Sequence, residues 1–239
     1  EGTPFDITND LGAGPYSMPY RPSPLSFEVD GKEYFNERPI STFQTAFTFV
    51  AQLRDYLPNA IGGVMWFGTD DANMVVYTPV YCSATAVPDC YAERYADPLV
   101  FSWNSSFWVF NWVSNMIYPK YSLVIDDMRE VQSTLENSIY ERSRAVEAEA
   151  AAVYASSPRY AQQMLTEFTC AAAEETLEAW KAFGEKVIVK YNDFVIKREN
   201  NGRLQRSSTG LAGGMTRPGY PEEYWREVVR QSGERYMVP

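Results

Sequence analysis

The spacing of apolar residues changes near residue 100 and divides the chain into two kinds of pattern. Before this point, short stretches alternate between apolar and polar residues, as strands do. Beyond residue 105, apolar residues recur at helical spacing. We therefore expect residues 1–100 to hold a loop-rich start, strand hairpins and one helix, and residues 101–239 to be helical. Both parts are expected to belong to one domain.

Strand and turn signals dominate the beginning of the chain. Proline and glycine interrupt residues 1–24, which predicts a loop. Alternation over 25–29 and 32–36 predicts a hairpin, and Asp30-Gly31 between the two stretches favours a tight turn.

A helix and a second strand pair are expected next. Ser41 or Thr42 can cap a helix that runs to about Tyr56. The apolar residues at helical spacing in this stretch are Phe43, Phe47, Val50 and Leu53. Residues 62–68 and 74–82 are rich in Val, Trp, Phe and Tyr, which predicts two strands buried on at least one face.

Helices fill the second part of the chain. The pattern predicts an aromatic helix over 106–118, which Pro119 interrupts. A long helix then ends near Ser156, and Pro158 can begin another at its first turn. These two long helices would pack as an antiparallel hairpin. The remaining expected elements are a flexible loop over 200–219 and a short terminal helix over 221–230.

This order of elements indicates an α+β fold. Four strands are too few to form an independent sheet in a chain of 239 residues. They are typical of edge strands that complete a sheet whose other strands lie elsewhere. The pattern therefore favours part of a larger structure.

Composition excludes several classes of function. The chain has no histidine, so it contains no Ser-His-Asp triad, Cys-His pair or H-E-x-x-H zinc site. Three cysteines cannot supply a four-thiolate zinc site, and we expect neither a metal nor a cofactor. The net charge of -10 opposes binding to nucleic acid. No apolar run reaches the roughly 18 residues that a membrane span needs.

Several segments together resemble the C-terminal part of C69-family dipeptidases. In order along the chain they are DLGAGP (10–15), NER (36–38), STFQTAFTFVAQ (41–52), IGGVMWFGTDDA (61–72), VYTPVYC (76–82), FSW (101–103), FWVFNWV (107–113), KYND (190–193) and GYPEE (219–223). No one segment is diagnostic, but their order and spacing are specific.

The resemblance implies an N-terminal-nucleophile hydrolase with an αββα sandwich, in which two stacked sheets lie between helical layers. Such an enzyme hydrolyses dipeptides and other small amides. Its nucleophile is a cysteine that becomes the first residue after a propeptide is removed. The free α-amine of that cysteine, with a pKa near 7.7–8.0, can act as the base without a histidine.

The chain departs from this pattern at the nucleophile. Glu1 is not a nucleophile, and Cys82, Cys90 and Cys170 are internal. The resemblance therefore places the catalytic cysteine upstream, and this chain alone is expected to be inactive. Two alternatives remain: a non-catalytic binding or scaffold protein that keeps the fold, and an unrelated helical interaction domain built on residues 120–190.

Five residues are candidates for substrate binding. Related amidases place an arginine near the nucleophile, so Arg21 or Arg38 could hold a substrate carboxylate, although both could also be surface or structural residues. Asp70, Asp71 and Asn73 could bind a substrate amine or a metal; the alternative is a solvent-exposed turn.

The cysteines bear on where the protein is located in or outside the cell. Cys82 and Cys90 could form a disulfide that closes a short loop, or remain reduced structural thiols. Such a disulfide would favour a periplasmic or secreted protein over a cytoplasmic one. Cys170 is expected to be a small buried apolar residue. The expected partners are a dipeptide substrate, the remaining N-terminal part of the same enzyme and a second copy in a homo-oligomer.

Overall fold

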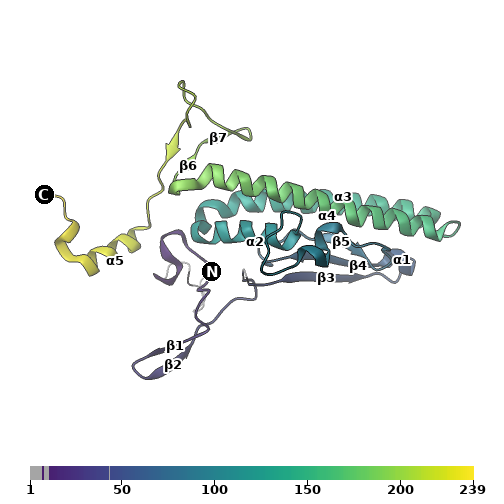
Figure 1. Cartoon of the computed structure of the whole chain (residues 1–239), viewed down its shortest axis with the longest axis horizontal. Helices are drawn as coiled ribbons and strands as arrows, with labels where there is room; N and C mark the ends of the chain where they lie inside the picture. The colour runs from purple at the N-terminus through teal and green to yellow at the C-terminus, as the bar shows by residue number, and fades with distance from the viewer. Residues whose placement is uncertain (1–6, 8–10, 43) are drawn as a thin grey trace. The chain divides into compact units, whose positions relative to one another are not determined.

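The computed structural model describes residue 7 and residues 11–42 and 44–239, and it confirms an α+β fold (Figure 1). The chain divides into two compact units. Unit 1 comprises residues 1–39, 116–125 and 186–239, and unit 2 comprises residues 40–115 and 126–185. Each unit is described below by its own contacts.

An antiparallel sheet of three strands forms one side of unit 2. Its order is β3 (Phe47–Leu53), β4 (Gly63–Thr69) and β5 (Thr78–Tyr81), and the short helix α1 (Asn59–Gly62) precedes β4. Trp66 of β4 lies opposite Val50 on one side and Pro79 on the other.

The helix expected over residues 42–56 is wrong, because β3 occupies this stretch. Its apolar residues fit helical spacing, but aromatic and β-branched side chains also favour a strand. Pairing with β4 at seven positions decides between the two. Phe43, expected on the apolar face of that helix, lies outside the described residues.

The strand expected over 74–82 is shorter than predicted. Only Thr78–Tyr81 pairs with β4. Before it, Met74 and Val75 donate backbone hydrogen bonds of 3.0 and 2.9 Å to the carbonyl of Asp71, which makes a turn. The side chains of Met74, Val75 and Val76 are buried.

The aromatic helix and the two long helices expected after residue 105 are confirmed. They are α2 (Ser106–Ile117), α3 (Tyr121–Tyr154) and α4 (Pro158–Tyr191). Figure 1 shows α3 and α4 side by side as a long hairpin. In unit 2, Phe110 of α2 stacks on Trp180 of α4 with ring centroids 4.6 Å apart. None of the helices in the described ranges combines the length and apolar character needed to cross a membrane.

The two faces of the unit 2 sheet have different surroundings. Even-numbered side chains of β4 face α3, since Trp66 packs on Tyr140 with ring centroids 6.1 Å apart. On the opposite face, Phe67 contacts Phe47 and Tyr91. Tyr91 comes from the irregular segment between β5 and α2, which holds the short turns η2 (Asp89–Tyr91) and η3 (Glu93–Tyr95).

Unit 1 contains the predicted first hairpin, β1 (Ser26–Val29) and β2 (Lys32–Phe35). Asp30 and Gly31 have φ values of 52° and 73°, as a two-residue hairpin turn requires. The other elements are η1 (Leu11–Tyr16), η4 (Tyr118–Lys120), η5 (Asn192–Phe194), the pair β6 (Ile196–Lys197) and β9 (Met215–Thr216), the pair β7 (Glu199–Asn200) and β8 (Arg203–Leu204), α5 (Glu222–Ser232) and η6 (Gly233–Tyr236).

Gly184 marks the close contact between α2 and α4. A Cβ atom at this position would lie 2.3 Å from Cζ3 of Trp112 and 2.9 Å from Cγ2 of Val113. We expect Gly184→Ala to lower the free energy of unfolding by about 1–2 kcal/mol, because overpacking outweighs the gain in helix propensity. Urea denaturation measures this change. Ser138→Ala, on the exposed side of α3, is the control and should change it by less than about 0.5 kcal/mol.

Candidate functional site

A buried carboxylate follows β4. Asp70 is 1% exposed and has a φ of 70°. Its two carboxylate oxygens accept hydrogen bonds of 2.7 Å from Nδ2 of Asn111 and from Oγ of Ser114, both on α2. Burial raises the pKa of Asp70 to about 6, although these hydrogen bonds act in the opposite direction. Asp70 therefore holds α2 against the end of β4 and gains or loses its proton near pH 6.

The next carboxylate closes a turn. Asp71 is fully buried, and its Oδ1 accepts hydrogen bonds from Oγ of Ser41 and from the backbone N–H of Asn73, the latter at 3.0 Å. Gln132 of α3 donates a hydrogen bond of 3.3 Å to the carbonyl of Asn73. The turn is thus held by both the segment before β3 and the helix layer.

The structure places Asp70, Asp71 and Asn73 in one turn, but the interpretation as a solvent-exposed turn is wrong. Both carboxylates are buried and accept hydrogen bonds from other elements. Their role in substrate binding stays a prediction. Within the described ranges, no three His, Cys, Asp or Glu side chains gather in a way that could hold a metal ion.

The two candidate arginines belong to unit 1. Nε of Arg21 donates a hydrogen bond of 3.1 Å to Oδ1 of Asn36. Asn36 is buried and donates through Nδ2 to the carbonyls of Arg21 and Pro24. Arg38 is half-buried, two residues further along. Arg21 therefore has a structural contact, and a substrate role for either arginine stays a prediction.

A buried ion pair was missed by the sequence analysis. Nη1 and Nη2 of Arg54, which follows β3, lie 2.6 and 2.8 Å from the two carboxylate oxygens of Glu147 on α3. The side chains are only 12% and 10% exposed. Nη2 also donates to the carbonyl of Ile61 at 3.0 Å, and the Tyr81 hydroxyl donates to Glu147 at 2.9 Å.

A sequence signal for this pair exists. The buried stripe of α3 continues beyond Ile139 through Ser143, Glu147 and Ala150, at helical spacing. A carboxylate on a buried stripe needs a cation or hydrogen-bond donors. Helical spacing thus marks Glu147 as a side chain that needs a partner, but it does not identify Arg54 as that partner.

The surroundings of Arg54 and of the Tyr81 hydroxyl raise the pKa values of both groups. The hydrogen bond to Glu147 raises the pKa of Arg54. Burial, followed by the nearby Glu147, raises the pKa of the Tyr81 hydroxyl. Arg54 therefore stays charged and Tyr81 remains a hydrogen-bond donor at neutral pH.

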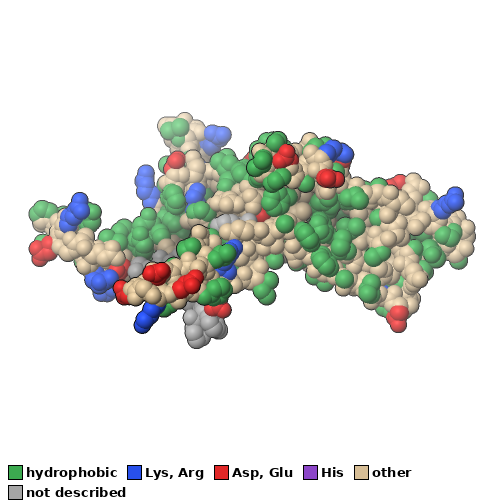
Figure 2. Space-filling view, turned by 60° about the horizontal axis from the view of Figure 1, so that its bottom comes forward, with side chains coloured by type: hydrophobic (Ala, Val, Ile, Leu, Met, Phe, Trp, Pro, Cys, Tyr) green, Lys and Arg blue, Asp and Glu red, His purple; other side chains and the backbone are tan. Residues whose placement is uncertain are grey.

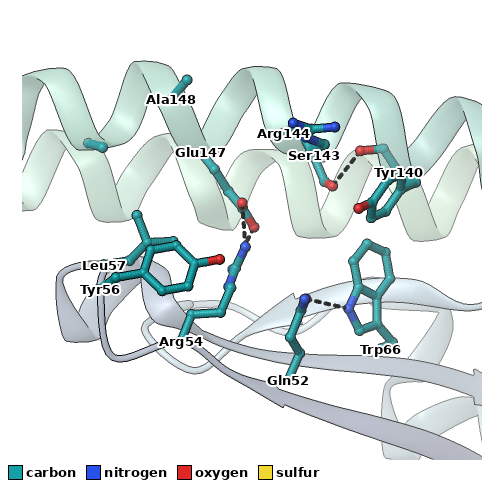
Figure 3. A pocket seen from close by; sticks show the side chains of 11 residues that line it. Gln52, Arg54, Tyr56, Leu57, Trp66, Tyr140, Ser143, Arg144, Glu147 and Ala148 are labelled. Atoms are coloured by element: carbon teal, nitrogen blue, oxygen red, sulfur yellow. Dashed lines mark hydrogen bonds and ion pairs between the residues drawn. The ribbon is translucent and has the colours of Figure 1, made fainter.

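A cavity of about 420 Å³ opens beside the ion pair, between the sheet and α3 (Figure 3). Trp66 lies against Tyr140 on one side of it, and Nε1 of Trp66 donates a hydrogen bond of 3.1 Å to Gln52. The Ser143 hydroxyl donates to the carbonyl of Tyr140 at 2.7 Å. This hydroxyl is therefore engaged by the backbone of α3.

Residues 1–134 match the sequence model described as Peptidase family C69. The chain belongs to peptidase family C69. The protein named "Probable dipeptidase B" from Streptococcus pyogenes serotype M1 is 25% identical over 173 residues, which are 71% of this chain and 32% of that relative. The chain therefore spans about a third of the length of the curated relative it matches. Family membership overturns the alternative of an unrelated helical interaction domain.

The predicted disulfide of this C69-family chain is absent, because Cys82, Cys90 and Cys170 are all free thiols. Cys82 is exposed at the end of β5, with its Sγ beside Gly63. Cys90 is buried, and its backbone N–H donates to Glu174 of α4 at 2.9 Å. Burial raises the pKa of the Cys90 thiol, which makes it unreactive. The expectation of a periplasmic or secreted location loses its support from this disulfide.

The carboxyl of Asp70 should give the C69 chain a pH-dependent stability. Its folded pKa of about 6 lies above the unfolded value of about 3.9, so the folded state binds more protons between these values. The free energy of unfolding should therefore fall as pH rises from about 4 to about 6. Urea denaturation across this range should show a smaller fall for Asp70→Asn. Asp126→Asn, exposed on α3, is the control, and equal slopes for both variants would contradict the assignment.

The buried ion pair should stabilise the fold far more than an exposed one. Glu147→Ala leaves Arg54 buried without its counter-ion, and we expect a loss of about 3–5 kcal/mol in the free energy of unfolding. Glu175→Ala removes the exposed pair with Arg142 and should cost at most about 1 kcal/mol. Urea denaturation at low salt compares the two. Similar losses of stability in the two variants would show that the buried pair stabilises the fold no more than the exposed pair does.

Proposed function

We propose that this chain is the C-terminal part of a cysteine-type dipeptidase whose nucleophile lies upstream of Glu1. Membership of family C69 is the observation that carries the proposal. A relative named as a probable dipeptidase, of which the chain spans about a third, supports it. The substrate class is dipeptides and other small amides.

The proposed architecture is the αββα sandwich of N-terminal-nucleophile hydrolases. The sheet of unit 2 supports it, because α3 covers one face while the other face is only partly covered by the segment before α2. A second sheet would lie on that second face. The rest of the polypeptide would supply it together with the nucleophile.

The proposed chemistry is acyl transfer to the upstream cysteine. Its free α-amine takes the thiol proton, the thiolate attacks the peptide carbonyl, and hydrogen-bond donors hold the oxyanion. The tetrahedral intermediate then collapses to the thioester as the C–N bond breaks, and the protonated α-amine gives its proton to the leaving amine. Water attacks the thioester with the α-amine as base, which releases the carboxylic acid and returns the thiol. Arg21 and Arg38 are the candidates for holding the substrate carboxylate, since a guanidinium binds it with two parallel hydrogen bonds.

Asp70, Asp71 and Asn73 would contribute by positioning. Their turn is fastened to α2 and α3, and a substrate amine would have to enter a buried site to reach the carboxylates. We therefore propose that they fix the end of β4 and do not touch the substrate. A homo-oligomer remains compatible with this proposal.

Dipeptide hydrolysis tests the proposal. The 239-residue chain should not hydrolyse unblocked dipeptides, whereas the whole polypeptide of the source gene, with a processed N-terminal cysteine, should. Replacing that cysteine with alanine should abolish hydrolysis, because the acyl-enzyme is proposed to form on its thiol. Release of amino acids is the measurement.

Cys82→Ser in the whole polypeptide is the matched control. Its thiol is exposed but has no α-amine beside it, so hydrolysis should continue at the original rate. A mature polypeptide without an N-terminal cysteine, or one that hydrolyses dipeptides after its replacement, would favour the non-catalytic binding or scaffold protein instead.

A further inference from the structure

One edge of the unit 2 sheet, β3, pairs with no other strand among the residues that the structure describes. The carbonyl of Ala46 accepts a hydrogen bond of 3.0 Å from Asp70, and the N–H of Arg54 donates one of 3.1 Å to Gly62. Because antiparallel residues alternate in direction, the even-numbered residues of β3 face β4. The residues whose backbone groups point outward are therefore Phe47, Phe49, Ala51 and Leu53. Within the described ranges, no hydrogen bond involves these four N–H groups.

The opposite edge of the same sheet is closed. In β5, the N–H of Cys82 donates to Gly63 at 3.0 Å, so the backbone groups of Pro79 and Tyr81 point outward. Proline has no N–H, and the N–H of Tyr81 donates to Oγ1 of Thr169 on α4 at 3.5 Å. A proline and a covering helix are standard protections of an edge strand. This sheet is thus protected at β5 and open at β3.

The open edge of β3 exposes several large apolar side chains to solvent, which is unfavourable. Phe47, Phe49, Val50 and Leu53 are 56%, 53%, 54% and 82% exposed. Val50 lies on the face toward α3 between the polar residues Thr48 and Gln52, whereas the other three lie on the opposite face. The exposed apolar side chains of this edge are therefore mostly on the face away from α3. Figure 2, turned so that the lower side of Figure 1 comes forward, shows apolar side chains at the surface of unit 2. Long apolar edge strands of this kind are prone to pair with other strands.

Space for side chains exists beside this edge. The cavity of about 420 Å³ is lined by Gln52 and Arg54, and a second of about 330 Å³ by Val50, Trp66 and Tyr140. Both lie between β3 and α3. An added strand directs alternate side chains to one face of the sheet. In strand addition, pockets on that face receive these side chains.

We propose that the open edge of β3 pairs with a strand from the remaining part of the same enzyme. The inference rests on the proposed function, because the occupant is chosen from the coverage of about a third of the dipeptidase-like relative. The added strand would extend the sheet beyond β3, fill the cavities beside α3 and cover Phe47 and Phe49.

Backbone hydrogen exchange tests the pairing. In the 239-residue chain, the amides of Phe49 and Ala51 should exchange as solvent-exposed groups. In the whole polypeptide they should exchange at least about 100-fold more slowly, since the added strand must leave before they open. The even-numbered amides of Val50 and Gln52, which face β4, are the internal control and should be protected in both.

A proline variant gives an independent measurement. Ala51→Pro removes an outward N–H and leaves the hydrogen bonds to β4 in place. It should lower the melting temperature of the whole polypeptide by several degrees more than that of the 239-residue chain. Ala51→Val keeps the N–H and should show no such difference.

The outcomes separate this proposal from the proposed function. If the whole polypeptide hydrolyses dipeptides while the amides of Phe49 and Ala51 exchange freely, the strand pairing is overturned and the dipeptidase stands. If the amides are protected but no hydrolysis occurs, the pairing stands and the dipeptidase falls. Protection already present in a dimer of the 239-residue chain would assign the edge to a second copy and overturn the proposal, as would a gene that encodes no further residues.

Discussion

The ion pair between Arg54 and Glu147 determines how the unit 2 sheet lies on α3. Arg54 follows β3, and Tyr81 ends β5, so the Glu147 carboxylate is bonded to groups from both outer strands. Apolar packing such as that of Trp66 on Tyr140 is non-directional and tolerates small displacements. The two parallel hydrogen bonds between a guanidinium and a carboxylate are directional, so they do not tolerate such displacements. The cavity beside the pair exists because these contacts hold the strand ends at a set distance from the helix.

Most of the fold follows from local sequence signals. Helix periodicity, with Pro119 as an interruption and Pro158 as a helix start, located α2, α3 and α4, and Asp30-Gly31 located the first hairpin. The error at β3 has a physical cause. FTFVAQL satisfies both helical and strand spacing, and only the β4 backbone, ten residues further along, favours the strand. Pairing between segments that are distant in sequence is not encoded in either segment alone.

The site was predicted less well than the fold for a related reason. Asp70 and Asp71 were identified as notable carboxylates, but a turn composition gives no indication that Asn111 and Ser114 will bury one of them. The disulfide was inferred from a short separation in sequence. Glu174 of α4 holds Cys90 inside the protein instead, and Cys82 stays at the surface. In both cases, a residue on a helix more than twenty residues further along the chain determines whether the side chain is buried.

The unequal edges of the sheet also limit how copies of this chain can assemble. A sheet that is open on both sides can add strands indefinitely and grow into a fibre, as a head-to-tail interface does. With Pro79 and Thr169 closing β5, only the β3 edge could accept a further strand. Association through this sheet would therefore end after one event, in a closed pair of finite size. The proline in β5 would thus prevent polymerisation, on the side of the sheet away from the open edge.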